Sequence, residues 1–503
     1  MAKLEEDNIG RSGWNTLIIL SCLGLIVLFD ETMILPAIPD FIHNFNISYN
    51  ISSWLLSAYI IAAAVMTPIG GKLSDIYGKK KILLTIMAVY AVGVLAGRFA
   101  TNIEFMLAAR VAQGVGMAMF PIAFGIIREV LPEKKLAIGQ TIFSSTFSGG
   151  AVVGLVGGAA IIQNFGWRAT FLAILPVAIA LWLIIARFVQ VKSPASSSIE
   201  AERIVEGNDN SSLSVRTIDI KGTLALAATI ITFLAGITFL ESNNEGAKYE
   251  VAGLFAASGV SLAVFILIEK RVRSPLLDFK LMTSKSFLLP TIILMLVFMS
   301  IFMVYLTIPV MVRSPEPLGF GGNAVAVARV QLPFMIVLFI GTIMSGFILN
   351  RVKNTKLMVF GTTISAIGFF VVFIFHSTEN MVSFGLTILA AGLSLSITGA
   401  FNLILVSVPM QMTGIALGMT LLLNLVGMSV GPAVSGILQE TYKGIVPKLP
   451  GLFPTDHAYN LIFITAALLS LGSVIMALSA VRTEIRTVTT IIRGQREPNR
   501  DYR

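Results

Sequence analysis

Two apolar stretches of the chain are joined by Gly71-Lys72-Leu73-Ser74-Asp75-Ile76-Tyr77-Gly78-Lys79-Lys80-Lys81. Glycines at these positions favour a tight turn, and Asp75 can accept hydrogen bonds from the N-terminus of a neighbouring helix. The final lysines place positive charge where anionic lipid headgroups lie. A generic basic loop needs no Gly, Asp and Gly at these intervals. We therefore predict an ordered turn between two membrane-spanning helices, with a conformational switch made by Gly71, Asp75, Gly78, Lys79 and Lys80.

The composition of the whole chain is that of a membrane protein. Of the 503 residues, 55% are hydrophobic and 13% are charged, whereas an ordinary soluble domain is about 25% charged. A soluble protein of this length cannot hide so much apolar surface in one core. Many stretches approach the roughly 20 apolar residues that span hydrocarbon. We predict an all-α polytopic membrane fold with about fourteen spans, at 14–38, 52–74, 80–98, 103–127, 136–162, 169–190, 220–240, 250–269, 286–311, 324–349, 356–375, 381–404, 413–438 and 459–481.

The two halves of the chain resemble each other. Gly346 opens a segment similar to the one that Gly71 opens, at an offset of 275 residues (346 − 71 = 275). The segments that begin at Gly154 and Pro432 match at an offset of 278 (432 − 154 = 278). Parallel repeats of this kind are a transporter architecture. We expect a six-helix bundle at 14–190, a cytoplasmic polar linker at 191–219, an inserted helix pair at 220–269, a second six-helix bundle at 286–481 and a basic cytoplasmic tail at 482–503.

Basic residues are distributed unevenly between the two sides of the predicted spans. With the N-terminus inside, the inner segments hold 28 of the 36 Lys and Arg residues, and the outer segments hold 6. Because Lys and Arg favour cytoplasmic loops, we expect a multi-pass protein of the cell membrane with both termini in the cytoplasm. The net charge of +9 then lies beside anionic lipid. Membrane lipid is therefore an expected partner, and nucleic acid is not.

The sequence does not indicate a metal site or a cofactor. Cys22 is the only cysteine, and His43, His376 and His457 all fall in predicted outer segments. A metal site needs several Cys, His or acidic ligands close together. We therefore expect no metal ion, no cofactor and no histidine proton relay.

Two acidic residues and one basic residue lie where charge is costly. Of the 27 acidic residues, only Asp30 and Glu31 lie well inside a predicted span, so each needs a cavity or a partner. Successive residues are about 100° apart around a helix, so the two acids cannot face the same way. Arg110 lies at a similar depth to Asp30, roughly 12–14 Å by helical rise. We predict a proton-coupling site made by these three residues, because buried carboxyl groups bind protons reversibly. The alternative is a structural ion pair with no role in transport.

Small and polar residues in the spans give two further candidate sites. Glycine costs about 1 kcal/mol per position in a helix, so the repeated glycines of span 136–162 indicate close packing or a hinge. The hinge candidates are Gly154, Gly157, Gly158, Gly431 and Pro432. The candidates for a substrate cavity are Tyr59, Gln113, Tyr305, Arg329 and Asn424. Arg329 lies near a helix end and could instead extend outward.

These motifs resemble those of the major facilitator superfamily. Gly71–Lys81 is similar to motif A of that superfamily, and Arg110–Gly116 is similar to motif B, whose arginine is implicated in proton coupling. Asp30-Glu31-Thr32 with Pro39, and Trp54 with Tyr59 and Pro68, resemble the fourteen-helix drug:proton antiporters. The resemblance covers nearly the whole chain. It implies two six-helix bundles, two additional helices and secondary active transport.

The chain departs from the pattern of these antiporters at three places. Motif C of helix 5 normally reads Gly-Pro-x-x-Gly-Gly, whereas Gly154 is followed here by Leu155. Leu35 stands where the helix-1 motif has Asn, and Asn350 stands where the second copy of motif A has an acid. Membership of the superfamily does not depend on these positions.

We therefore expect a transporter that moves a small molecule by alternating access. The leading hypothesis is proton-coupled efflux of drug-like or amphipathic compounds. The alternative within the same class is a proton-linked symporter or facilitator of a polar metabolite. A membrane-embedded enzyme is disfavoured because the spans hold no metal cluster and no nucleophile–His pair. A receptor is disfavoured because the linker and tail are short and polar.

Overall fold

The computed structural model describes residues 9–132, 135–189, 220–239, 245–272, 279–349, 351–408, 413–447 and 449–496. In this part of the chain, fourteen helices are long and apolar enough to cross a membrane. This confirms the predicted fold class. The predicted linker at 191–219, Asn350 and the last residues of the tail lie outside the described residues.

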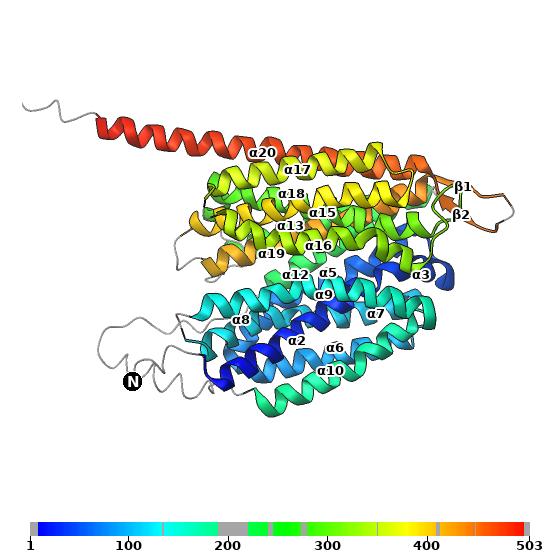
Figure 1. Cartoon of the computed structure of the whole chain (residues 1–503), viewed down its shortest axis with the longest axis horizontal. Helices are drawn as coiled ribbons and strands as arrows, with labels where there is room; N and C mark the ends of the chain where they lie inside the picture. The colour runs from blue at the N-terminus through cyan, green and yellow to red at the C-terminus, as the bar shows by residue number, and fades with distance from the viewer. Residues whose placement is uncertain are drawn as a thin grey trace, which may run out of the picture.

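The first half of the chain forms one group of helices (Figure 1). Its elements are α2 (Arg11–Met33), η1 (Leu35–Ala37), α3 (Ile38–Phe45), α4 (Tyr49–Ser52), α5 (Trp54–Tyr77), α6 (Lys79–Arg98), α7 (Ile103–Gly114), η2 (Val115–Ala118), α8 (Met119–Val130), α9 (Leu136–Phe165) and α10 (Arg168–Phe188). The first span is longer than predicted, because the 3₁₀ turn at Pro36 redirects the helix without ending it.

The second half forms another group, preceded by the inserted pair α12 (Ile220–Phe239) and α13 (Glu245–Glu269). Its elements are α14 (Phe279–Thr283), α15 (Lys285–Arg313), α16 (Ala324–Leu349), α17 (Asn354–Ile374), α18 (Glu379–Val406), α19 (Thr413–Thr441), β1 (Lys443–Ile445), β2 (Leu452–Pro454) and α20 (Asp456–Arg496). The strands pair antiparallel, with Gly444 opposite Phe453. The sequence did not indicate this short hairpin.

The inserted pair lies against both halves. α12 packs on α5 of the first half and on α19 of the second. Two hydrogen bonds connect it to the start of the second span: Asn50 Nδ2 donates to Thr238 O at 2.5 Å, and Trp54 Nε1 donates to Thr238 Oγ1 at 2.9 Å. α13 packs on α12 and keeps most of its own surface outside the protein. α12 is therefore the part of the insertion that contacts the two bundles.

Glycines bring one helix pair very close in each half. A Cβ atom added to Gly154 of α9 would lie 2.5 Å from Phe29 O of α2. In the second half, a Cβ atom on Gly431 of α19 would lie 2.4 Å from Met299 O of α15. α2 therefore packs on α9 as α15 packs on α19, which is the repeat that the sequence indicated. The close-packing interpretation of these glycines explains the contacts, and the hinge stays a prediction.

The two halves meet tightly at one end, which we call the closed end: residues 36–57, 304–322 and 429–454. The Arg313 guanidinium donates to both carboxylate oxygens of Asp40, at 2.6 and 2.7 Å, and to Pro36 O at 2.9 Å. Tyr49 N donates to Glu440 Oε2 at 2.9 Å, and Ser57 Oγ donates to Ser429 O at 2.9 Å. Each of these bonds joins the first half to the second.

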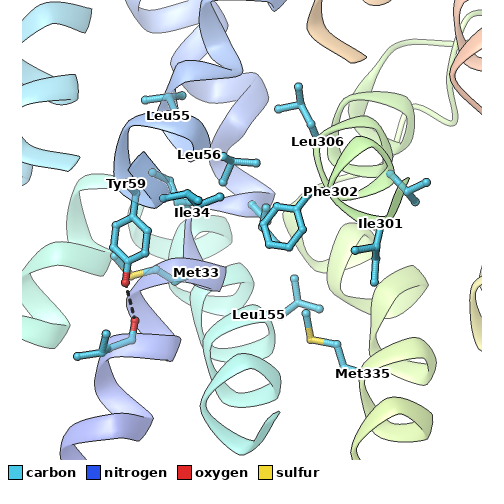
Figure 2. Close-up of a cluster of buried hydrophobic side chains, with 14 of the residues drawn as sticks. Met33, Ile34, Leu55, Leu56, Tyr59, Leu155, Ile301, Phe302, Leu306 and Met335 are labelled. Atoms are coloured by element: carbon cyan, nitrogen blue, oxygen red, sulfur yellow. Dashed lines mark hydrogen bonds between the residues drawn. The ribbon is translucent and has the colours of Figure 1, made fainter. Parts of the chain in front are cut away.

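Apolar side chains fill the space directly beneath the closed end (Figure 2). Met33, Leu56 and Leu155 from the first half face Phe302 and Met335 from the second, and all five are buried. Along α15, every residue from 301 to 312 is buried except Tyr305, whereas seven residues between 288 and 299 are partly exposed. The ribbons of the two halves also diverge away from the closed end (Figure 1). The interface is therefore buried at the closed end, and α15 carries more exposed side chains toward its other end.

The close approach of α9 to α2 leads to a stability prediction. Gly154→Ala should lower the stability of the purified protein by about 1–3 kcal/mol, because the added methyl group meets backbone atoms that cannot rotate away. Gly149→Ala, on the same helix, is the matched control, since nothing lies within 4 Å of its added Cβ. Thermal unfolding in detergent measures both variants. Equal melting temperatures for the two would contradict the close packing.

A second prediction concerns the closed end. Arg313→Gln should open this end more often, by roughly tenfold, because it removes a charge-assisted bidentate contact worth about 1.5 kcal/mol or more. The measurement is the rate at which an aqueous maleimide labels Ser57→Cys in a Cys22→Ser background. Exchanging the two charges (Asp40→Arg with Arg313→Asp) should restore slow labelling. An unchanged labelling rate in Arg313→Gln would show that the pair does not hold the halves together.

Candidate functional site

The two acids of helix α2 occupy different environments. The Asp30 side chain is fully buried, and the Glu31 side chain is partly exposed. The 100° step between successive helical residues accounts for the difference, as the sequence predicted. Asp30 thus faces the interior of the first half, and Glu31 lies on the accessible side of the same helix.

Arg110 of α7 is the partner that the structure brings to Asp30. Its Nη1 atom lies 3.6 Å from Asp30 Oδ2, and both side chains are 0% exposed. The guanidinium Nε atom donates to Leu55 O at 3.0 Å, and Nη1 donates to Gln113 Oε1 at 2.7 Å. The Tyr59 ring lies under the guanidinium, 4.3 Å from its carbon, a distance at which cation–π attraction operates. Residues of three helices, α2, α5 and α7, therefore fix the position of this one positive charge.

The ion pair is incompletely satisfied. Within the described residues, neither carboxylate oxygen of Asp30 has a hydrogen-bond partner, and neither does Arg110 Nη2. A buried carboxylate normally accepts several hydrogen bonds. Here only the Coulomb attraction to Arg110 compensates the charge. Adding a proton to Asp30 would therefore weaken one attraction and break no hydrogen bond to the described part of the chain.

Glu31 lies close to aromatic residues from both halves. Its carboxyl group lies within electrostatic range of Arg110 and of the hydroxyl groups of Tyr59 on α5 and Tyr305 on α15. Tyr59 OH itself donates to Val27 O at 3.3 Å (Figure 2). Glu31 is thus an accessible acid placed where the two halves meet, beside the fully buried acid Asp30.

At the equivalent position of the second half, the acid of this charged site is replaced by Ser300. In the first half, the residue that approaches Gly154 is Phe29, and Asp30 comes next in the sequence. In the second half, the residue that approaches Gly431 is Met299, and Ser300 comes next. Ser300 Oγ donates to Leu296 O of its own helix at 2.9 Å. The repeat therefore preserves the helix packing and replaces the acid by a neutral hydroxyl group.

The turn predicted over residues 71–81 is confined to Gly78, because α5 continues to Tyr77 and α6 begins at Lys79. Gly78 has φ of 96°, in the left-handed region that favours glycine. The Lys79 ammonium forms an ion pair with Glu129 of α8, and its Cε atom would lie 2.8 Å from a Cβ atom on Gly125. Gly71 lies beside Pro121 of the same helix, and Lys80 is partly exposed. The side chain of Asp75 lies outside the described residues.

A model of the family described as Major Facilitator Superfamily matches residues 20–432, most of the chain. The chain belongs to this superfamily. It is 26% identical to the multidrug efflux pump LfrA of Mycolicibacterium smegmatis over 88% of this chain and 84% of that one. It is 24% identical to multidrug resistance protein 3 of Bacillus subtilis, over 69% of this chain and 63% of the relative, less than two thirds of its length.

Solved structures agree on the fold. The chain is similar to the crystal structure of a bacterial homologue of the human lysosomal transporter Spinster, in an inward-facing and unoccupied conformation. The TM-score is 0.64 at 14% identity, over 95% of this chain and 99% of that one. At this identity the likeness shows the major facilitator fold alone. The protein is therefore a multi-pass transporter of a small molecule, in the superfamily that its motifs indicated.

The other residues predicted to line a substrate cavity do not lie together in one place. Gln113 belongs to the Arg110 cluster, and its Nε2 donates to Gly93 O at 3.0 Å. Asn424 is buried on α19 with both amide atoms unpartnered among the described residues. Arg329 is 70% exposed at its side chain and lies 3.7 Å from Glu379, so it does not join the other candidates. The sequence reasoning missed the Arg313–Asp40 contact and the buried amide of Gln331.

The buried pair leads to a test of its electrostatic role. Arg110→Gln should lower stability by about 3–5 kcal/mol, because it leaves the Asp30 charge buried without its partner. Combining it with Asp30→Asn should recover part of the loss. Arg329→Gln, whose side chain is exposed, should change stability by less than about 1 kcal/mol. If the double variant is no more stable than Arg110→Gln alone, the Asp30 charge is not what Arg110 compensates.

Proposed function

We propose that this transporter exports drug-like amphipathic compounds, cations among them, in exchange for protons. The observation that carries the proposal is the fully buried carboxyl group of Asp30, which one ion pair and no protein hydrogen bond compensates. The accessible carboxyl group of Glu31 lies on the next residue. Relatives such as LfrA are described as multidrug efflux pumps, which supports this substrate class.

In this proposal, Asp30 binds the coupling proton and Glu31 binds the substrate cation. A proton on Asp30 weakens its attraction to Arg110 and lets α2 and α7 shift against each other. A cationic substrate competes with protons for the Glu31 carboxylate, where the two halves meet. A ligand can move a conformational equilibrium only if it interacts differently with the two states. The proton meets that condition at Asp30, because it changes the charge facing Arg110.

The proposed orientation of the chain in the membrane indicates which conformational state this structure would represent. The excess of Lys and Arg in the predicted inner segments favours both termini in the cytoplasm. The closed end, on this orientation, faces outside, and the opposite end faces the cytoplasm. The structure would then be the inward-facing state, with Arg313 and Asp40 holding the outer side shut.

The turn at residues 71–81 would act in the opposite state. Asp75 and the lysines that follow are proposed to close the inner face when the protein faces outward. In the present state, Lys79 pairs with Glu129 inside its own half, which keeps this switch away from the second half. Anionic lipid at the inner face is the proposed partner of the exposed basic residues.

One feature favours the second candidate, proton-linked symport of a polar metabolite. Leu155 stands where the antiporter motif C has proline, so α9 lacks the helix distortion that a proline introduces there. The direction of substrate movement under an imposed proton gradient separates the two candidates. Antiport moves substrate against the proton flow, and symport moves it with the flow.

The proposal predicts different transport defects for the two acids. Asp30→Asn should abolish accumulation driven by a pH gradient while leaving some downhill exchange, because the neutral side chain no longer responds to protons. Glu31→Gln should weaken transport of cations more than transport of neutral compounds. Arg110→Ala should damage both modes, since it leaves a buried carboxylate unpaired, at a cost of several kcal/mol.

The measurement is substrate flux in proteoliposomes with and without an imposed pH gradient. Glu104→Gln serves as the control, because Glu104 is an exposed acid on α7, the helix of Arg110, and lies outside both the buried pair and the Arg313 contact. Full gradient-driven accumulation by Asp30→Asn would exclude Asp30 as the coupling residue. Glu31 would then be the remaining acid inside the first span.

A further inference from the structure

The closest contacts of the Arg110 guanidinium are with uncharged groups. Its Nε atom donates to Leu55 O at 3.0 Å, its Nη1 atom donates to Gln113 Oε1 at 2.7 Å, and the Tyr59 ring covers one face. The Asp30 carboxylate is farther away, with Oδ2 3.6 Å from the same Nη1 atom. That distance is too long for a hydrogen bond. Nη1 therefore contacts a neutral amide more closely than it contacts the acid.

The Gln113 amide is fixed at both ends. Oε1 accepts from Arg110, and Nε2 donates to Gly93 O of α6 at 3.0 Å. Glycines make room for this arrangement: a Cβ atom on Gly97 would lie 3.1 Å from Gln113 Nε2, and one on Gly93 would lie 2.8 Å from Gln113 N. The Gln113 side chain is 0% exposed, so it cannot turn out to solvent. The backbone of α6 therefore aims the Gln113 carbonyl at Arg110.

Gln113 and Asp30 compete for one atom of Arg110. A carboxylate is a stronger acceptor for a guanidinium than an amide is, yet the amide is at 2.7 Å and the carboxylate is at 3.6 Å. A hydrogen-bonded ion pair favours the charged form of an acid more than a longer ion pair does. The place of the guanidinium therefore bears on how readily Asp30 binds a proton.

Among the described residues, few other titratable groups face Asp30. Glu31 is the next residue of α2, and the hydroxyl groups of Tyr59 on α5 and Tyr90 on α6 lie within electrostatic range. α9 and η1 pack on α2 and contain no acidic, basic or histidine residue. α8 and α10 also pack on α2, and their charged residues lie near their ends: Arg128, Glu129, Arg168 and Arg187. Arg110 is therefore the cation whose position matters for this acid.

We propose that Gln113 is a positioning residue for proton binding, because its amide holds Arg110 back from Asp30. Asp30 then takes up its proton at a higher pH than it would beside a hydrogen-bonded arginine. The inference rests on the proposed coupling of transport to protons at Asp30, and it assigns Gln113 to that site. Arg110 keeps its bonds to Leu55 O and Gln113 when the acid is neutralised. Protonation therefore frees α2 and leaves α7 in place.

Infrared difference spectroscopy of the purified full-length protein in nanodiscs tests this role, because a protonated carboxylic acid absorbs apart from a carboxylate. The Asp30 signal is the one that Asp30→Asn abolishes, and its intensity is followed against pH. Gln113→Met should move the midpoint to lower pH by roughly one unit, since the released Nη1 atom can close on Asp30. Gln113→Glu should move the midpoint to higher pH, because a second carboxylate shares the charge of Arg110.

Gln439→Met is the matched control. It removes a fully buried glutamine of the second half whose Nε2 donates to Ser435 Oγ at 3.0 Å. This variant should lower the melting temperature, as Gln113→Met does, and leave the midpoint of the Asp30 signal unchanged.

A Gln113 variant whose midpoint stays in place or moves the opposite way would overturn the positioning role alone, and so would an equal shift in Gln439→Met. If one Gln113 variant does not fold, the other decides. An Asp30 carboxyl group that exchanges no proton at any pH where the parent stays folded would contradict the proposed proton coupling, and the positioning role with it.

Discussion

The Asp30–Arg110 ion pair determines how the first half is packed. A bare charge deep in the membrane is costly, so the helices that carry and surround this pair must approach closely. Arg110 connects α7 to α5 through Leu55 O, and Gln113 connects α7 to α6 through Gly93 O. Glycine permits the approach: a Cβ atom on Gly114 would lie 2.3 Å from Tyr59 O. The small residues near the ion pair thus allow the surrounding helices to pack closely enough to enclose it.

The second half uses the same packing for different chemistry. α15 and α19 meet through glycines as α2 and α9 do, yet no acid takes the place of Asp30. The interior of this half holds hydroxyl and amide groups. Some are hydrogen-bonded to one another, such as the side chains of Thr307, Ser435 and Gln439. Hydroxyl and amide groups do not change charge with pH, so the buried charge that can respond to protons lies in the first half at this pair of equivalent positions.

Sequence reasoning predicted what depends on local pattern. Span number follows from apolar length, and the pairing of Asp30 with Arg110 followed from counting helical rise on two spans. The Arg313–Asp40 contact could not be predicted this way, because its residues lie near helix ends 273 positions apart in the chain and nothing local distinguishes them from other loop charges. The exposure of Arg329 depends on which face of α16 points out of its bundle. The sequence does not show this, because apolar residues occupy all faces of that helix. Gln331 is likewise one amide in an apolar helix, and only its missing partners distinguish it.

The first span joins the buried Asp30–Arg110 pair to the closed end. Asp30 lies on α2, Pro36 lies in the 3₁₀ turn η1 and Asp40 lies on α3, so one continuous segment carries all three. Pro36 O and Asp40 both accept from Arg313 of the second half. Thr32, between the two sites, donates to Ala151 O of α9 at 3.0 Å, which anchors the middle of the segment. The Thr32 contact therefore lies between the buried ion pair and the Arg313 contact on the same continuous segment. Because the Arg313–Asp40 pair is partly exposed, its contribution is modest. A contact of modest strength can hold this end closed and still break when the conformation changes, as alternating access requires.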